Sequence, residues 1–387
     1  MLIKVVIKFT SRYSASYTPI ESITFMPILK EIDELLDSSI AAQEFTGAVY
    51  LIAQNQDILA LAARGDLVVT PEKILTTTDT IFDLASLTKP LVTGILLAQF
   101  LEEGLISLDK KISEIFPEFD IPEKQNLTIA QIASHSAGFR AWLPFYALLD
   151  KPSQVLSKIA QEPLVYEPGT KVVYSDLSYL TLGFLLEKIS GEPLAKLLRQ
   201  RILQPLDLKY TCFNPPIEWQ KQIAASEEGN KYEKQLAGNL AADFPYWREE
   251  VIWGEVHDGN AYFLGGIAGH AGLFSTAKEV FLLAQQFLPG SLLLKDSTLE
   301  LFSKNFTPSC EEGRSLCWLL AEFGVNAGNT LPKECFGHAG FTGTSLWIDP
   351  VRSRTYILLT NRTHPKYWDF NMNDRRREFH KLAQKLF

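Results

Sequence analysis

The chain has 387 residues, of which 46% are hydrophobic and 21% are charged, and its formal net charge at pH 7 is −8. This length fits one large domain or two interlocked domains, and this composition excludes a disordered or fibrous chain. An acidic chain has no general attraction to nucleic acid or anionic lipid, and no run of about twenty apolar residues occurs, so we expect neither a nucleic-acid partner nor a membrane span.

Residues 1–25 are predicted to form an N-terminal arm, because a stretch rich in Ser, Tyr and Thr precedes Met26, and the sequence leaves the order of this arm open. The start contains no apolar run of about seven residues, which a secretory signal peptide needs, and this favours a cytoplasmic location. Residues 27–42 carry apolar side chains at helical spacing. Residues 47–65 form two apolar stretches around an Asn-Gln-Asp turn, which predicts a β-hairpin.

A strongly apolar segment that ends at Gly104 predicts a buried helix whose first turn lies near Ser86. The next block, residues 105–265, is rich in helical patterns and in Pro/Gly loops. The last third of the chain returns to strands, with a second predicted hairpin over residues 343–361, and it ends in a charged amphipathic helix.

These elements predict an α/β (α+β) fold in which an antiparallel sheet is flanked by helices. We expect the α/β domain to comprise residues 26–104 and 266–387, with an all-helical subdomain, residues 105–265, inserted between its two parts. Because no repeat or low-complexity linker divides the chain, an insertion is favoured over two independent domains. The functional site is expected in the cleft between them.

The motif Ser-x-x-Lys occurs twice, at Ser86–Lys89 and at Ser275–Lys278, and about one or two copies are expected by chance in a chain of this length. On a helix, both side chains of the motif lie on one face. Ser86 is predicted at the first turn of a buried helix, where backbone N–H groups favour negative charge on its oxygen. The apolar surroundings of Lys89 would lower its pKa and make it a base. Ser275 precedes a surface-type helix and is interpreted as its N-cap.

Other hydrolase and cofactor motifs are missing from the sequence. It has no G-x-S-x-G elbow of the α/β-hydrolases, no H-E-x-x-H of zinc peptidases, and no G-x-G-x-x-G or Walker A pattern. Its four cysteines form no C-x-x-C pair, so reduced thiols are expected rather than a disulfide scaffold. We therefore expect a reaction without a cofactor and without a metal.

Residues 82–90 (FDLASLTKP) resemble the first motif of the serine β-lactamase and penicillin-binding-protein superfamily. Residues 174–176 (Tyr-Ser-Asp) resemble its second motif, Tyr-x-Asn, and residues 338–340 (His-Ala-Gly) resemble its third, Lys-Thr-Gly. The motifs occur in the family's order, and the resemblance extends from about residue 27 to the end. It is greatest to the class C-like branch, which holds serine esterases, D-amino-acid peptidases and low-activity penicillin-binding proteins.

The resemblance implies a role for each matching residue. Ser86 would attack a carbonyl and become acylated, while Lys89 and Tyr174 would share the work of general base and acid. The backbone N–H groups of Ser86 and of Phe341, on the strand after His338, would form the oxyanion hole. Which of Lys89 and Tyr174 is the base stays open, because the two protons are coupled.

Three residues depart from the family's motifs. His338 replaces a lysine, and since its unperturbed pKa is about 6.5 it is mostly neutral at pH 7, so recognition of a substrate carboxylate should weaken. Ala339 replaces a threonine and removes a hydroxyl, whereas Gly340 keeps the glycine. Asp176 replaces an asparagine with an acceptor-only carboxylate, which would repel anions or pair with Lys89.

These departures favour neutral or cationic substrates, so the first hypothesis is a carboxylesterase-like serine hydrolase that acts on a small ester or amide. The second is a β-lactamase or a D,D- or D-amino-acid peptidase, and the third is an inactive ligand-binding homologue. His270 and Trp253 are further candidates for the pocket wall. The sequence leaves the natural substrate and the oligomeric state open.

Overall fold

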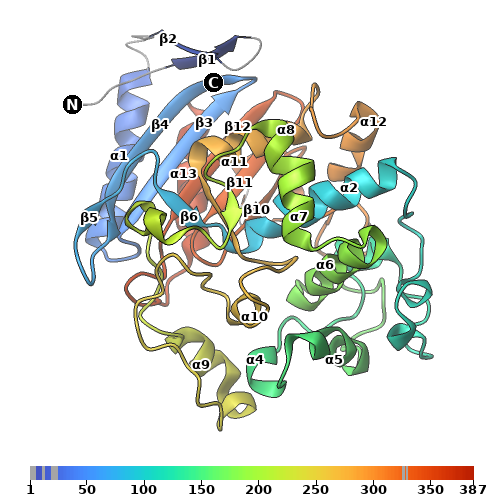
Figure 1. The fold of residues 1–387 in the computed structure, drawn as a ribbon. Coiled ribbons are helices and arrows are strands. Elements are labelled where there is room, and N and C mark those ends of the chain that lie inside the picture. Colours follow the sequence, from blue (N-terminus) through green and yellow to red (C-terminus); the bar gives the residue numbers. More distant parts are fainter. Residues whose placement is uncertain (1–5, 11–13, 19–24, 325–326, 328–329) are drawn as a thin grey trace.

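A seven-stranded antiparallel sheet lies at the centre of the computed structural model, which describes residues 6–10, 14–18, 25–324, 327 and 330–387 (Figure 1). Strands β3 and β4 form one hairpin and β11 and β12 form another, as the apolar patterns predict. In spatial order the strands are β5 (Ile74–Leu75), β4 (Asp57–Val68), β3 (Gly47–Gln54), β12 (Arg354–Thr360), β11 (Ser345–Asp349), β10 (Phe336–Ala339) and β9 (Leu319–Leu320). A smaller sheet has the order β6 (Ile81–Asp83), β8 (Leu273–Thr276) and β7 (Cys212–Phe213).

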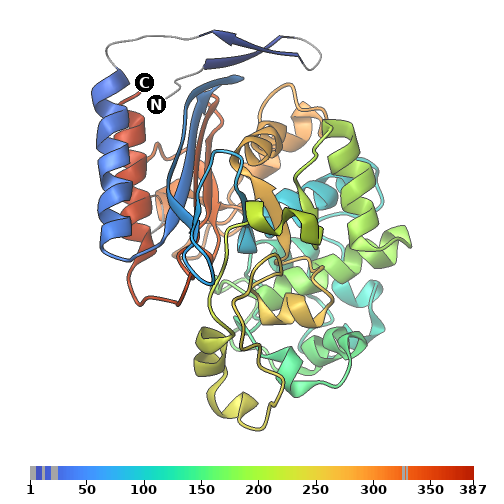
Figure 2. The same cartoon turned by 60° about the vertical axis from the view of Figure 1, so that its left-hand side comes forward.

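Two long helices, α1 (Phe25–Ala41) and α13 (Met372–Gln384), cover one face of the large sheet (Figure 2). Because successive side chains of a strand point to opposite faces, β3 supplies two hydrophobic cores at once. Tyr50 packs on this face, with its ring 6.0 Å from that of Phe379 in α13, whereas Leu51 belongs to the core on the other face. The two helices predicted near the ends of the chain are thus confirmed, and the structure shows that they form one layer.

The other α-helices lie on the opposite side of the sheet, and most come from the middle of the chain (Figure 2). They are α2 (Ile95–Glu102), α3 (Ile129–Ala133), α4 (Phe145–Leu148), α5 (Val155–Gln161), α6 (Asp176–Ser190), α7 (Leu194–Leu198), α8 (Gln204–Leu206), α9 (Lys231–Ala237), α10 (Gly259–Phe263), α11 (Ala277–Ala284) and α12 (Asp296–Leu299). The block 105–265 contains α3 to α10 but is not entirely helical, because its strand β7 pairs with β8. The division into an α/β domain and an inserted subdomain stays a prediction.

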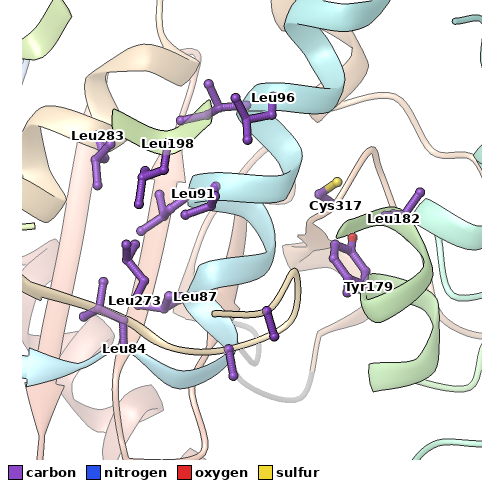
Figure 3. Close-up of a cluster of buried hydrophobic side chains, with 14 of the residues drawn as sticks. Leu84, Leu87, Leu91, Leu96, Tyr179, Leu182, Leu198, Leu273, Leu283 and Cys317 are labelled. Atoms are coloured by element: carbon purple, nitrogen blue, oxygen red, sulfur yellow. The ribbon is translucent and has the colours of Figure 1, made fainter. Parts of the chain in front are cut away.

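The segment that begins beside Ser86 is helical and buried, as predicted, but it is not one regular α-helix. A 3-10 turn (η1, Ala85–Leu87) is followed by a π-helical stretch (η2, Lys89–Gly94), which continues into α2. Figure 3 shows leucines of this segment packed beside Leu273 from β8 and Leu283 from α11. A helix that is apolar all round needs such burial, and π-helical turns are frequent at functional sites.

The second Ser-x-x-Lys motif is divided between a strand and a helix. Ser275 lies in β8 and is fully buried, with its Oγ 2.7 Å from the Oγ1 of Thr211. The N-cap of α11 is Thr276, whose hydroxyl accepts a hydrogen bond from the N–H of Glu279. The interpretation of Ser275 as the N-cap is therefore wrong by one residue, because the strand extends further than the sequence pattern indicates.

Part of the predicted N-terminal arm forms an antiparallel hairpin of β1 (Val6–Thr10) and β2 (Ser14–Thr18), and β1 lies beside β4. The rest of the arm, up to residue 24, lies outside the described residues. Among the helices that are described, none has both the length and the apolar character needed to cross a bilayer.

Candidate active site

Ser86 lies directly after a strained turn of the backbone. Ala85 has a φ of +46°, which is uncommon for a residue with a side chain. The carboxylate of Asp83, at the end of β6, holds this turn: it accepts a 2.8 Å hydrogen bond from the N–H of Ala85 and another of 2.8 Å from the N–H of His257. Ser86 is partly exposed, whereas Ala85 and Leu87 are buried. The turn therefore presents the serine hydroxyl at the end of an otherwise buried helix.

Lys89 is fully buried, and its ammonium joins three parts of the chain. Its Nζ donates a 2.9 Å hydrogen bond to the Oγ of Ser86 and a 3.1 Å hydrogen bond to the carbonyl oxygen of His270. The Oδ1 of Asp176, the first residue of α6, lies 2.7 Å from the same Nζ. Asp176 thus pairs with Lys89, which is one of the two roles expected for it.

The pKa of Lys89 is raised above its ordinary value, which corrects the prediction of a lowered pKa. Burial by itself lowers the pKa, as the apolar surroundings suggest. The charge of Asp176 and the contact with Tyr174 raise it by more than burial lowers it. Lys89 is therefore an ammonium ion in the resting site.

Tyr174 lies just before α6, with its ring centroid 4.9 Å from the Nζ of Lys89. His135, from the loop after α3, holds this position: its ring lies 4.6 Å from that of Tyr174, and its Nδ1 accepts a 3.0 Å hydrogen bond from the N–H of Ser175. Burial raises the pKa of Tyr174, and the charge of Lys89 offsets only part of this rise. The phenol is consequently protonated in the resting site.

A second pair of titratable side chains flanks Lys89. The Nε2 of His270 lies 2.9 Å from the Oδ1 of Asp258, and although burial raises the pKa of Asp258, His270 lowers it by more. Ligand atoms of Asp176, Asp258 and His270 lie within 4.8 Å of one another, a grouping that can hold a metal ion. Since the ammonium of Lys89 already neutralises Asp176 there, the reaction without a metal is kept as a prediction. Trp253, the other candidate for the pocket wall, donates a hydrogen bond from its indole N–H to the backbone carbonyl of Ile223.

His338 lies in β10 and is 3% exposed, with its ring 5.7 Å from that of Tyr174. The third motif, at His338, therefore lies next to the second motif, at Tyr174. Burial and the positive charges of Lys89 and Arg314 hold the pKa of His338 well below its ordinary value. The ring is neutral at pH 7, as expected from its side chain.

Phe341 was expected on the strand after His338. It lies instead in the turn between β10 and β11, because β10 ends at Ala339. Gly340 lets this turn pack closely against the segment that carries Ser86. A Cβ added at Gly340 would lie 2.5 Å from the carbonyl oxygen of Leu84, so any larger residue would push the two segments apart. The turn therefore lies beside the nucleophile segment.

Arg376 holds the same turn from the other face of the sheet. Its buried guanidinium extends from α13 and donates hydrogen bonds of 2.9 Å to the carbonyl of Gly340 and 3.0 Å to the carbonyl of Thr344. The ring of Phe341 is also stacked, 5.5 Å from Tyr367. Side-chain and backbone contacts thus fix the turn from two directions.

Arg314, which the sequence analysis missed, places a permanent cation near the position where His338 lacks one. It precedes β9 and is 6% exposed, and its guanidinium carbon lies 5.6 Å from the ring centroid of Tyr174. Its Nη2 lies 2.5 Å from a carboxylate oxygen of Glu312. Arg314 belongs to no sequence motif. It lies near the site because β9, which follows it, pairs with β10.

These contacts form a set of groups suited to nucleophilic catalysis. A partly exposed hydroxyl accepts a hydrogen bond from a buried ammonium, and a phenol lies against the same ammonium. Because the hydroxyl, ammonium and phenol share one small volume, a proton can pass among them when the hydroxyl attacks an acyl group.

The sequence matches the Beta-lactamase family over residues 32–380. It is 35% identical over 331 residues to a protein of Escherichia coli strain K12 named "Putative D-alanyl-D-alanine carboxypeptidase", and the match covers 78% of this chain and 74% of that protein. A protein of the same name from Escherichia coli O157:H7 is 33% identical over 380 residues, covering 89% of this chain and 85% of the other.

Solved structures have the same fold. EstCE1, described as a hydrolase with promiscuous acyltransferase activity, aligns with a TM-score of 0.72 at 21% identity over 93% of this chain and 100% of its own. A protein titled Beta-Lactamase/D-Alanine Carboxypeptidase from Pseudomonas syringae aligns with a TM-score of 0.71 at 16% identity over 92% of this chain and 98% of its own. The predicted fold class and the family resemblance are confirmed.

Proposed function

The chain belongs to the beta-lactamase family, and on that premise we propose that it is a serine hydrolase in which Ser86 is the nucleophile and an acyl-enzyme is the intermediate. The observation that carries this proposal is the position of the Lys89 ammonium, 2.9 Å from the Oγ of Ser86 and 2.7 Å from the Oδ1 of Asp176. Such a contact orients the hydroxyl and supplies positive charge where an alkoxide forms.

In this mechanism Ser86 attacks the substrate carbonyl while its proton passes to the coupled pair of Lys89 and Tyr174. Because Lys89 and Tyr174 are both protonated at rest, the reacting form is the one in which this pair has lost one proton. Tyr174 is proposed to lose it and, as a phenolate stabilised by the Lys89 ammonium, to accept the proton of Ser86. The backbone N–H groups of Ser86 and Phe341 are proposed to bind the oxyanion. The same pair then returns the proton to the leaving group, and water hydrolyses the acyl-enzyme.

For the substrate we propose a short peptide that ends in D-alanyl-D-alanine, as the name of the curated relatives suggests. Arg314 favours this class. Its guanidinium pairs with Glu312 through Nε and Nη2, and its Nη1 group, close to Tyr174, can hold a terminal carboxylate that neutral His338 cannot. The second candidate is a carboxylesterase-like activity on neutral esters or amides. It is favoured by the neutral ring of His338 and by the carboxylate of Asp176.

Four substrates separate these functions. Release of D-alanine from an acylated D-Ala-D-Ala dipeptide is measured against the matched L-Ala-L-Ala dipeptide, a p-nitrophenyl ester and a chromogenic cephalosporin. We expect Arg314→Gln to raise KM for the D,D-dipeptide by about tenfold or more and to leave hydrolysis of the neutral ester unchanged. Ester turnover alone would favour the carboxylesterase, and cephalosporin turnover alone would favour a β-lactamase. No turnover and no labelling by a fluorophosphonate would contradict the proposal and favour an inactive homologue.

Replacing Asp176 by asparagine is expected to move the rising limb of the pH–rate profile to lower pH by about one unit or more. The charge of Asp176 raises the pKa of both Lys89 and Tyr174. The reacting form needs one proton fewer on this pair, so a lower pKa produces that form at a lower pH. The measurement is kcat/KM from about pH 6 to about pH 10 for both proteins. A limb that stays in place or moves to higher pH would contradict the coupling.

A further inference from the structure

A cavity of about 810 Å³ lies between α4, α9 and α10. Figures 1 and 2 both show these three helices gathered at the end of the molecule away from β1 and β2. Its lining is strongly aromatic and includes Tyr146, Phe244, Tyr246, Trp247, Tyr262 and Phe263. Neither the mechanism nor the sequence motifs involve this cavity.

The aromatic rings form one continuous wall. The ring of Tyr146 lies 5.3 Å from that of Phe244 and 5.6 Å from that of Trp247, and the last two rings are 5.0 Å apart. Other apolar groups at the cavity stay open to solvent, since Tyr246 is 80% and Tyr262 is 47% exposed. Large apolar groups that remain exposed around a cavity mark a binding site.

Two polar groups of this cavity have unused hydrogen-bonding capacity. Glu233 is 5% exposed, and its Oε1 accepts a 2.8 Å hydrogen bond from the N–H of Gly259. The carboxylate of Glu233 and the hydroxyl of Tyr146 lie within hydrogen-bonding reach of each other, and this contact helps burial to raise the pKa of Tyr146. Among the described residues, neither the Oε2 of Glu233 nor the hydroxyl of Tyr146 has another hydrogen-bond partner. Each of these two oxygens therefore keeps a lone pair that can accept a further hydrogen bond from a ligand.

The neighbouring charges decide whether the carboxyl of Glu233 can bind a cation. Burial and the charge of Asp258 raise the pKa of Glu233 to about 7, while His257 and Arg248 lower it. The guanidinium of Arg248 is already occupied, because it donates to Asn230 and to the carbonyls of Val256 and His257. Among the described residues, none of its N–H groups donates to the Oε2 of Glu233, although its charge lowers the pKa of that carboxyl.

We infer that this cavity binds a primary ammonium group carried on an apolar stem. The ammonium would donate hydrogen bonds to the Oε2 of Glu233 and to the hydroxyl oxygen of Tyr146, using the remaining lone pair of each oxygen. The faces of the surrounding aromatic rings would stabilise the positive charge, and the stem would fill the apolar space.

The cavity and the active site share one stretch of backbone. Gly259, which binds Glu233, directly follows Asp258, which contacts His270, and the carbonyl of His270 accepts a hydrogen bond from Lys89. A ligand in the cavity can therefore be the remote part of a molecule whose acyl group reaches Ser86. This extension to the substrate rests on the proposed function, whereas the binding of an amine does not.

Binding is tested with phenethylamine and with 2-phenylethanol, its neutral counterpart, by calorimetry on the full chain at about pH 8. We expect the amine to bind the natural protein at least tenfold more tightly than the alcohol. We expect Glu233→Gln to remove this difference, Tyr146→Phe to reduce it, and the exposed matched variant Glu249→Gln to keep it. Since the carboxylate form is needed, the amine should also bind more weakly at about pH 6 than at about pH 8.

Equal binding of the amine and the alcohol would overturn the inference, as would an unchanged preference in a Glu233→Gln protein that melts cooperatively. For the substrate, kcat/KM is compared for the p-nitrophenyl esters of 6-aminohexanoate and hexanoate. A preference for the amino ester that Glu233→Gln abolishes supports the inference. Hydrolysis of both esters that survives in Ser86→Ala would contradict the proposed nucleophile and would not affect the amine site. The same lack of preference in the natural protein and in Glu233→Gln would contradict the amine site and would not affect the nucleophile.

Discussion

Replacing Ser86 by alanine is expected to lower kcat by at least about 10⁴-fold, because the acyl-enzyme can then no longer form. The hydroxyl of Ser86 is partly exposed and lies 2.9 Å from the Lys89 ammonium. The measurement is turnover of a p-nitrophenyl ester, together with the intact mass of the protein after treatment with a fluorophosphonate. The natural protein should gain one adduct and the variant none.

The chain supplies a matched control in the second Ser-x-x-Lys motif. Ser275 is fully buried, unlike Ser86, and from β8 its Oγ forms a hydrogen bond with the Oγ1 of Thr211. Ser275→Ala should therefore keep both turnover and labelling. Ester hydrolysis that survives in Ser86→Ala, or that disappears in Ser275→Ala, would mean that the nucleophile is misassigned.

Replacing Lys89 by methionine is expected to lower kcat by about 10³-fold or more without lowering the free energy of unfolding. The variant loses the ammonium that polarises Ser86 and stabilises the Tyr174 phenolate. It also relieves the protein of a fully buried charge, and the side chain of Asp176, which is 18% exposed, can then be solvated. Kinetics and urea denaturation of the same preparation measure the two effects.

Lys278→Met is the control for this variant. Lys278 is 38% exposed and pairs with the exposed carboxylate of Asp79 at 2.8 Å, an arrangement that stabilises a protein by about 1 kcal/mol at most. Lys278→Met should leave turnover unchanged and should lower the free energy of unfolding by no more than about 1 kcal/mol. A Lys89→Met protein that keeps its turnover would exclude Lys89 from the reaction, and one that unfolds much more easily would show that Lys89 serves the fold.

The sequence predicted those features that local patterns carry. Apolar periodicity was sufficient for both hairpins and for the helices at the two ends of the chain, since each depends on residues close together in the chain. The motifs at Ser86, Tyr174 and His338 were identified by resemblance, and the structure places them together. The pattern was least accurate at element boundaries, where Thr276 rather than Ser275 is the N-cap of α11.

The sequence could not predict properties that depend on distant residues. The pKa of Lys89 is raised rather than lowered because Asp176, far along the chain, lies 2.7 Å away. Arg314 and His135 reach Tyr174 only through tertiary packing. Likewise, the cavity at Glu233 depends on three short helices whose individual patterns say nothing about the space between them.

The hydrogen bonds from Arg376 to the turn at Gly340 have a consequence for the time at which activity first arises during synthesis. On the ribosome, α13 emerges after Ser86, Lys89, Tyr174 and His338 have all been made. The turn at Gly340 remains without the hydrogen bonds of Arg376 until α13 docks on the sheet. A nascent chain that already contains the three motifs is thus expected to be inert towards acyl compounds, and competence for hydrolysis begins only when this late helix is released and folds.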